Sequence, residues 1–280
     1  MMDALLAREP VIRLACFAGV LALMAVLEAV LPRRTRTAGR WRRWPSNLGL
    51  VVVNTVVLRL IFPAAAVGVA LAAEARGVGL LPWLGLPVPL AIIAAIALLD
   101  VVIYLQHVLF HAVPALWRMH RMHHADLDFD VTTGLRFHPG EILLSMLITL
   151  AAVVALGAPA VAVLLFEVLL NATAMFNHAN LRLPGGLDRA LRLVLVTPDM
   201  HRVHHSVVPR ETNSNFGFSI ALWDRLFGTY HAQPAAGHTA MTIGLTQFRD
   251  PRELLLDRML TQPLRDGDRA YSLPNRESAS

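Results

Sequence analysis

The sequence PVPLAIIAAIALLDVVIYLQHVLFHAVPALWRMHRMHH, residues 87–124, joins an apolar segment directly to a group of histidines. The apolar part, 87–110, is long enough to cross the hydrocarbon core of a bilayer, which takes about 20 residues of helix. The histidines begin where this segment ends. The stretch therefore predicts a membrane helix that leads into a polar, histidine-rich region.

The composition of the whole chain agrees with a membrane protein. Of its 280 residues, 55% are hydrophobic and only 16% are charged, whereas about a quarter of an ordinary soluble domain is charged. The mean hydropathy is +0.52. Cys16 is the single cysteine, so an intrachain disulfide and a cysteine-based metal site are both excluded.

The positive charge of the chain also points to a membrane. The formal net charge is +5, and six arginines crowd into residues 33–43, between two apolar runs. This placement is typical of a cytoplasmic loop next to a membrane, and it argues against a nucleic-acid partner. We expect these arginines to hold anionic lipid headgroups; docking of an acidic electron carrier is the second interpretation.

We expect an all-α fold with about four membrane-embedded helical elements and a cytoplasmic, histidine-rich helical cap. Gly157-Ala158-Pro159 interrupts the last apolar run, which favours a hairpin that enters and leaves on one side. A signal peptide is the alternative for the first run, but no cleavage pattern follows it. The apolar runs are 11–31, 48–73, 87–110 and 142–173.

The same pattern divides the chain into three segments. We expect residues 1–99 to form a transmembrane region, 100–235 a histidine-motif region that includes the hairpin, and 236–280 a C-terminal cytoplasmic segment with a loose tail from about residue 265. If residues 33–43 are cytoplasmic, every polar segment after residue 110 lies on the cytoplasmic face as well.

Twelve histidines occur in the chain, none before residue 107. Residues at i, i+3 and i+4 share one face of a helix, so HxxxH and the two HxxHH motifs each gather imidazoles on one side of a helix. Such crowding leaves ring nitrogens that a metal ion can satisfy. His231 and His238 stand outside these clusters, and we expect them to be ordinary polar residues. The clustered and candidate residues are His107, His111, His120, His123, His124, His138, His178, His201, His204 and His205.

The number of histidines bears on the metal. A zinc site takes three or four protein ligands, which is fewer than the eight clustered imidazoles, so we expect two metal ions. Imidazole ligands without thiolate suit iron, copper, nickel or zinc. The residue types alone leave these four metals open.

The order of motifs resembles the sterol desaturase/fatty acid hydroxylase superfamily. HVLFH (107–111) and WRMHRMHH (117–124) are followed by RFHPGE (136–141), NHAN (177–180), PDMHRVHHS (198–206), ETNSNFGF (211–218) and WDRLFGTY (223–230). The resemblance covers roughly residues 100–230, and the first 85 residues are similar in hydropathy only.

The resemblance implies a di-iron centre held by these histidines at the cytoplasmic membrane surface, with His138 the least secure ligand. It implies O2-dependent hydroxylation or desaturation of a lipid such as a sterol or a fatty acyl chain. No flavin, nicotinamide or haem motif is present, so we expect electrons from a separate reductase, cytochrome or ferredoxin.

Two other functions remain possible on the sequence. A membrane zinc hydrolase would need a glutamate beside a paired histidine, and none follows a clustered histidine here. A non-enzymatic metal transporter or haem-binding protein would place histidines along a path at the bilayer midplane, whereas these lie at the ends of spans.

Four further residues are expected to support the ligands. Asp100, Tyr104, His107 and His111 lie on one helical stripe, and Glu167 lies eleven residues before His178. A charge at membrane depth needs a partner, so we expect Asp100 and Glu167 to accept hydrogen bonds from ligand imidazoles or from Tyr104. An ion pair between Asp100 and an arginine is the alternative, and Asp199 is a third, more exposed candidate.

Overall fold

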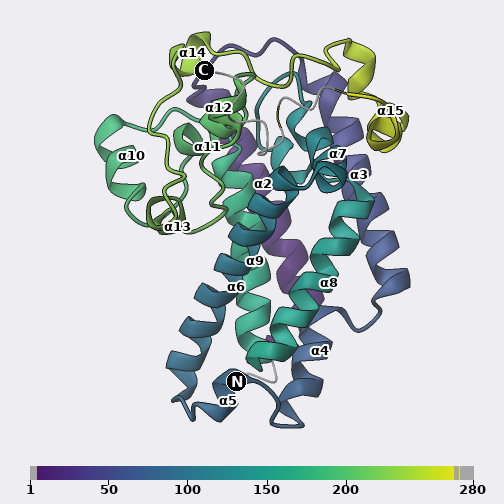
Figure 1. The fold of residues 1–280 in the computed structure, drawn as a ribbon, viewed down its shortest axis with the longest axis vertical. Coiled ribbons are helices and arrows are strands. Elements are labelled where there is room, and N and C mark those ends of the chain that lie inside the picture. Colours follow the sequence, from purple (N-terminus) through teal and green to yellow (C-terminus); the bar gives the residue numbers. More distant parts are fainter. Residues whose placement is uncertain (1–4, 268–270, 272–280) are drawn as a thin grey trace.

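The computed structural model describes residues 5–267 and 271. The described part is helical and contains no strand, only three isolated β-bridges. Long helices make up one end of the molecule, and short helices and loops form a cap at the other end (Figure 1). Most of the tail expected from residue 265 lies outside the described residues.

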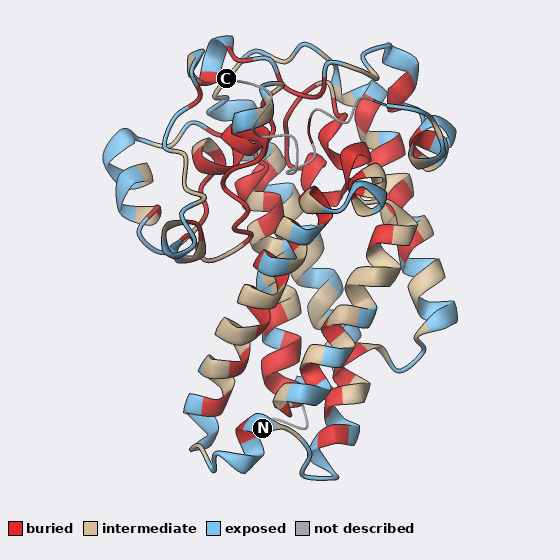
Figure 2. Ribbon diagram, in the orientation of Figure 1, coloured by how far each residue is buried: buried red, intermediate tan, exposed pale blue. Residues whose placement is uncertain are grey.

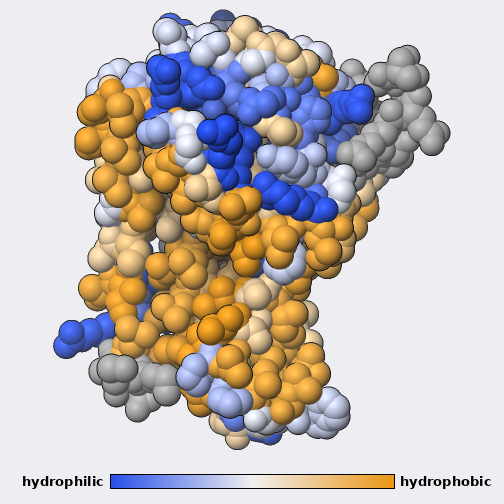
Figure 3. Space-filling model, turned by 90° about the vertical axis from the view of Figure 1, so that its left-hand side faces the viewer, coloured by the Kyte–Doolittle hydropathy of each residue, from blue (hydrophilic) through white to orange (hydrophobic). Residues whose placement is uncertain are grey.

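Five segments are long and apolar enough to cross a membrane. The membrane region contains α2 (Glu9–Val30), α3 (Arg40–Ile61), α4 (Ala65–Glu74), α5 (Leu80–Trp83), α6 (Val88–Ala112), α8 (Pro139–Leu156) and α9 (Ala160–Asn177). On the face drawn in Figure 3, the surface over these helices is mainly hydrophobic, and most of the hydrophilic surface lies on the cap. The expectation of a membrane protein with an α-helical cap is confirmed.

The cap is built from short elements. They are α7 (Pro114–His124), α10 (Gly185–Leu191), α11 (Pro198–His204), α12 (Pro209–Thr212), α13 (Leu222–Leu226), α14 (Gly237–Ala240) and α15 (Leu256–Thr261), with 3-10 turns at Thr133–Leu135, Pro251–Leu254 and Gln262–Leu264. Buried residues are concentrated where the cap meets the long helices (Figure 2).

The expected hairpin is present as α8 and α9, and both arms reach the cap (Figure 1). Each arm has 18 residues and is by itself a candidate span, so there are five candidate spans where we expected about four membrane-embedded elements. Gly157 ends α8 in the left-handed conformation, and Gly79 packs against it. A Cβ on Gly79 would overlap the backbone of Gly157, so this close approach requires glycine.

The expected single span at 48–73 is interrupted. Helix α3 ends at Ile61, and α4 begins at Ala65. Pro63 between them has no N–H to continue the helical ladder. Helix α4 then packs against α8 and α9, so the second apolar run bends into the bundle instead of crossing as one straight helix.

Candidate metal centre

Nine histidines meet at the boundary between the long helices and the cap. They come from α6, α7 and α11 and from the residues that end α9 and α11. None of them is more than 3% exposed. The nine are His107, His111, His120, His123, His124, His178, His201, His204 and His205.

The nine rings form two groups, and within each group the ligand nitrogens all lie within 4.8 Å of one another. The first, here called the cavity group, consists of His107, His111, His120, His124 and His204. The second, the inner group, consists of His123, His178, His201 and His205.

Hydrogen bonds to the backbone fix the tautomers in the cavity group. The Nδ1 of His107 donates to the carbonyl of Phe216 at 2.8 Å, and the Nδ1 of His204 donates to the carbonyl of Ser214 at 2.7 Å. A carbonyl only accepts, so in the neutral rings each Nε2 carries a lone pair and no proton. These two Nε2 atoms lie 3.0 Å apart.

The inner group repeats this arrangement. His123 donates through Nδ1 to the carbonyl of Arg136 and His178 to that of Ala174, at 3.2 and 2.7 Å. Their Nε2 atoms are 3.1 Å apart. Two lone pairs at this distance repel each other unless a cation lies between them. The donor set therefore fits a metal ion in each group.

Burial keeps the rings in the form that binds metal. Burial is the largest cause of a lowered pKa in six of these rings, and neighbouring imidazoles lower it further; the six are His123, His124, His178, His201, His204 and His205. The pKa of His178 falls to about 3. Those of His123, His124, His201, His204 and His205 fall well below 6.5. Neutral imidazole is the metal ligand.

Two side chains that the sequence did not single out orient rings of the cavity group. Glu141, in the first turn of α8, accepts from the Nδ1 of His120 at 2.7 Å. Asn213 presents Oδ1 to the Nδ1 of His111 at 3.0 Å. Ligand histidines usually donate to a carboxylate or carbonyl. An acidic residue in the first turn of an apolar helix, two positions after the His138-Pro139 pair, is the signal that could have identified Glu141.

His138 lies outside both groups. Its Nδ1 accepts from the backbone N–H of Gly140 at 3.0 Å, and its Nε2 donates to the carbonyl of Leu260 at 3.1 Å. Both ring nitrogens are thus engaged in capping α8 and holding the C-terminal segment. The structure gives His138 no place among the converging nitrogens.

The expected direct contacts of Asp100 and Glu167 are not found. Asp100 accepts from the N–H of Ile220 and the indole of Trp223, at 3.1 and 2.8 Å. Glu167 pairs with Arg13. The reason is distance along the helix: residues seven positions apart share a stripe but are separated by about 10 Å of rise. Asp100 instead anchors the loop that precedes α13.

Asp199 also pairs with other residues of the protein and contacts no ring of either histidine group. Its carboxylate pairs with Arg33 at 3.0 Å and with Arg202, and it lies 3.6 Å from the Nε2 of His238. Arg202 and Arg33 hold the pKa of Asp199 below its usual range, although burial opposes the shift. Asp199 thus joins the arginine-rich loop to α11.

Tyr104 reaches the metal centre indirectly. Its hydroxyl lies 2.9 Å from that of Thr229, which donates to Asp224 at 2.7 Å. Asp224 accepts from the N–H of Phe216, and the carbonyl of Phe216 accepts from His107. Tyr104 and Asp224 therefore position the peptide that orients His107.

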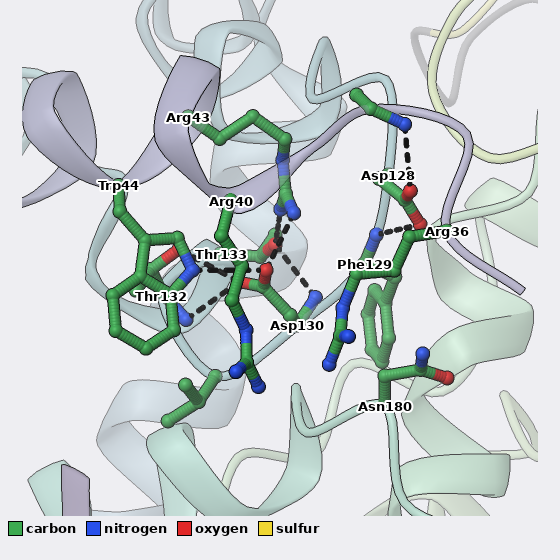
Figure 4. Close-up of polar contacts among 12 residues, drawn as sticks. Arg36, Arg40, Arg43, Trp44, Asp128, Phe129, Asp130, Thr132, Thr133 and Asn180 are labelled. Atoms are coloured by element: carbon green, nitrogen blue, oxygen red, sulfur yellow. Dashed lines mark hydrogen bonds and ion pairs between the residues drawn. The ribbon is translucent and has the colours of Figure 1, made fainter. Parts of the chain in front are cut away.

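The arginines of residues 33–43 form more ion pairs within the protein than we expected from the sequence. Arg43 is fully buried and donates to Asp126 at 2.7 Å. It also donates to Asp130, at 2.6 Å (Figure 4). Arg36 and Arg40 pair with the buried Glu28. Together with Arg33, four of the six arginines pair with acidic groups, so they are not free for lipid headgroups.

A cavity of about 590 Å³ runs from the metal centre into the membrane region. His107 and His120 of the cavity group line it, and no ring of the inner group does. Phe137 and Phe218 lie at this end of the cavity, and Ile103 and Leu170 are among the apolar residues farther along it.

Comparisons with known proteins agree with this site. A sequence model of the family described as fatty acid hydroxylase matches residues 92–229, which include all nine histidines. An ornithine lipid hydroxylase of Rhizobium tropici is 31% identical over 160 residues, 57% of this chain and 47% of that protein. No solved structure matches the chain.

Alkylglycerol monooxygenases are also similar. The protein of Xenopus tropicalis is 29% identical over 132 residues, and the human protein is 27% identical over 135 residues. These matches cover 45% and 46% of this chain and 27% and 28% of the relatives, so the chain spans less than half the length of the relatives it matches. The family match, these relatives and the histidine groups together identify the chain as a member of the sterol desaturase/fatty acid hydroxylase superfamily.

Proposed function

We propose that this protein is an O2-dependent di-iron enzyme that hydroxylates or desaturates a C–H bond of a membrane lipid. The observation that carries the proposal is the convergence of proton-free Nε2 atoms in two groups, one of which borders a cavity in the membrane region. The names of the relatives, a lipid hydroxylase and alkylglycerol monooxygenases, support a lipid substrate.

The nine histidines would hold two iron ions, one in each group, and His138 would hold neither. Bound iron supplies the activation of O2. The residues of the chain bind and orient: Glu141 fixes the ring of His120, and the carbonyl of Phe216 fixes that of His107. Apolar walls exclude water and hold a lipid chain beside these two rings.

Electrons would come from a separate reductase, cytochrome or ferredoxin, and the cap would lie in the cytoplasm. The arginines at residues 33–43 support this orientation. Single cysteines at Arg42 and at Asp250, both exposed and both on the cap side, should react with an impermeant thiol reagent only after the membrane is opened, in a Cys16→Ser background. Labelling of intact cells would overturn the orientation.

Metal analysis of the purified protein and lipid mass spectrometry test the function. We expect about two iron ions per chain, and a lipid of expressing cells that gains one oxygen atom or loses two hydrogens. One zinc ion per chain would support the zinc hydrolase instead, and haem a haem-binding protein. Iron-loaded protein that changes no lipid would overturn the enzymatic proposal.

A further inference from the structure

The end of the cavity away from the metal centre is lined by charged side chains. Glu9 and Arg13 of α2, Arg59 of α3 and Glu167 of α9 line the same cavity as His107. Eleven positions separate Glu167 from the end of α9 at His178, which corresponds to about 16 Å of helix. The cavity thus joins a metal centre to a charged region inside the membrane part.

Arg13, Arg59 and Glu167 lie within apolar segments, where an ionisable group costs at least about 2.5 kcal/mol and marks a functional site by default, and Glu9 is the first residue of α2. Arg59 lies in the candidate span Arg40–Glu74, with the whole of α4 still to follow. Its position is therefore not explained by the end of a span, where an arginine reaches the headgroup region.

The charges are unevenly distributed over the cavity walls. Arg13 pairs with both Glu9 and Glu167, so two carboxylates share one guanidinium on the wall formed by α2 and α9. Arg59 lies on a second wall of the cavity, which α3 forms where it packs against α8. Among the residues that the structure describes, Arg59 has no ion-pair partner. One wall therefore carries excess negative charge and the other an unpaired positive charge.

The interruption between α3 and α4 adds to this end of the cavity. Phe62 and Ala65, which flank Pro63, both line it. The helix break thus exposes the last turn of α3, with Arg59, to the same space as the carboxylates of Glu9 and Glu167.

We propose that this charged end binds the zwitterionic headgroup of the lipid substrate. The anionic part of the headgroup pairs with Arg59, and its ammonium group pairs with Glu9 and Glu167. The apolar chain extends along the cavity to His107 and His120. This inference rests on the proposed function, since it assumes that the cavity holds the lipid to be oxidised.

Binding of defined lipids to the iron-loaded protein tests the headgroup site. Native mass spectrometry in detergent would compare phosphatidylethanolamine, phosphatidylglycerol and diacylglycerol with identical acyl chains. We expect phosphatidylethanolamine to bind best. Arg59→Gln should weaken its binding about tenfold, as expected for the loss of one charge-assisted contact, and Arg59→Lys should retain part of the affinity. Glu167→Gln should reduce the preference for phosphatidylethanolamine over phosphatidylglycerol.

Arg76→Gln is the matched control, since Arg76 is exposed on the same half of the molecule but does not line the cavity. Equal binding of the three lipids, preference for phosphatidylglycerol, or unchanged affinity in Arg59→Gln would each overturn the headgroup site. Iron content is measured in every variant. Loss of iron from all of them, wild type included, would count against the di-iron function, whereas normal iron with no headgroup preference would count against the headgroup site alone.

Discussion

The cavity group and the inner group differ in how firmly the protein holds their rings. In the cavity group, four of the five Nδ1 atoms are anchored, two by carbonyls, one by the amide of Asn213 and one by Glu141. In the inner group, carbonyls anchor two of the four, and the Nδ1 atoms of His201 and His205 lack a partner among the described residues. The group beside the cavity is thus the more strongly preorganised.

This difference indicates a division of labour. Anchored ligands keep their geometry when an ion changes its state or its other ligands, and under the proposed function a substrate would lie beside the cavity group. No ring of the inner group lines this cavity, so an ion bound there would itself order the rings of His201 and His205.

The largest effect is expected from removing one ring of either group. His204→Ala in the cavity group and His123→Ala in the inner group should each abolish activity and lower bound iron, because each removes a converging Nε2. Metal analysis and lipid turnover measure both. His231→Ala is the control, and full activity in either group variant would contradict the di-iron centre.

The second largest effect is expected from lowering the pH, which should destabilise the metal-free protein through the histidines of both groups. The folded-state pKa values of the five cap histidines lie well below 6.5, so below about pH 6.5 the unfolded chain binds protons that the folded chain does not. The stability of metal-free protein should be complete above that pH and fall as pH decreases. Thermal unfolding of metal-free protein between about pH 8 and 5 measures it, and a melting temperature that rises on acidification would contradict buried neutral rings.

Glu141→Gln should weaken the anchoring of the cavity group and so reduce the difference in preorganisation between the two groups. The carboxylate that orients His120 becomes a neutral amide, and loss of such a partner lowers metal affinity or turnover about 10- to 100-fold. Asp100→Asn is the matched comparison. Asp100 binds the backbone of Ile220 before α13 and the indole of Trp223 in α13, so we expect the substitution to affect stability more than iron binding. A larger loss of iron in Asp100→Asn than in Glu141→Gln would reverse our assignment.

The smallest effect is expected from His138→Ala. The ring makes two neutral hydrogen bonds outside both groups, so its loss should cost about 1 kcal/mol of stability. Iron content should stay at the wild-type level. Loss of one iron ion in this variant would return His138 to the ligands.

The sequence predicted the helical class, the hairpin and the convergence of the nine histidines, because hydrophobic runs and i, i+3, i+4 spacings are local properties. It did not predict the break at Pro63 or the roles of Glu141 and Asn213. Those depend on which side chains meet across the fold: Asn213 lies 102 positions after the ring that it orients. The hydrogen-bond partners of Asp100 and Glu167 were predicted wrongly for the same reason, since a shared helical stripe does not specify which element packs against it.

The buried pair of Arg43 with Asp126 has a consequence for attempts to shorten or graft this protein. The family match begins at residue 92, yet Arg43 and Glu28 precede it and contact Asp126, Asp130 and the backbone of Asn180. A fragment that starts at residue 92 would lose Arg43, the ion-pair partner of both aspartates, together with the two helices that pack over this region. The histidine region therefore cannot be transferred to another protein by itself. A chimera must also carry α2 and α3 together with the acidic loop that they neutralise.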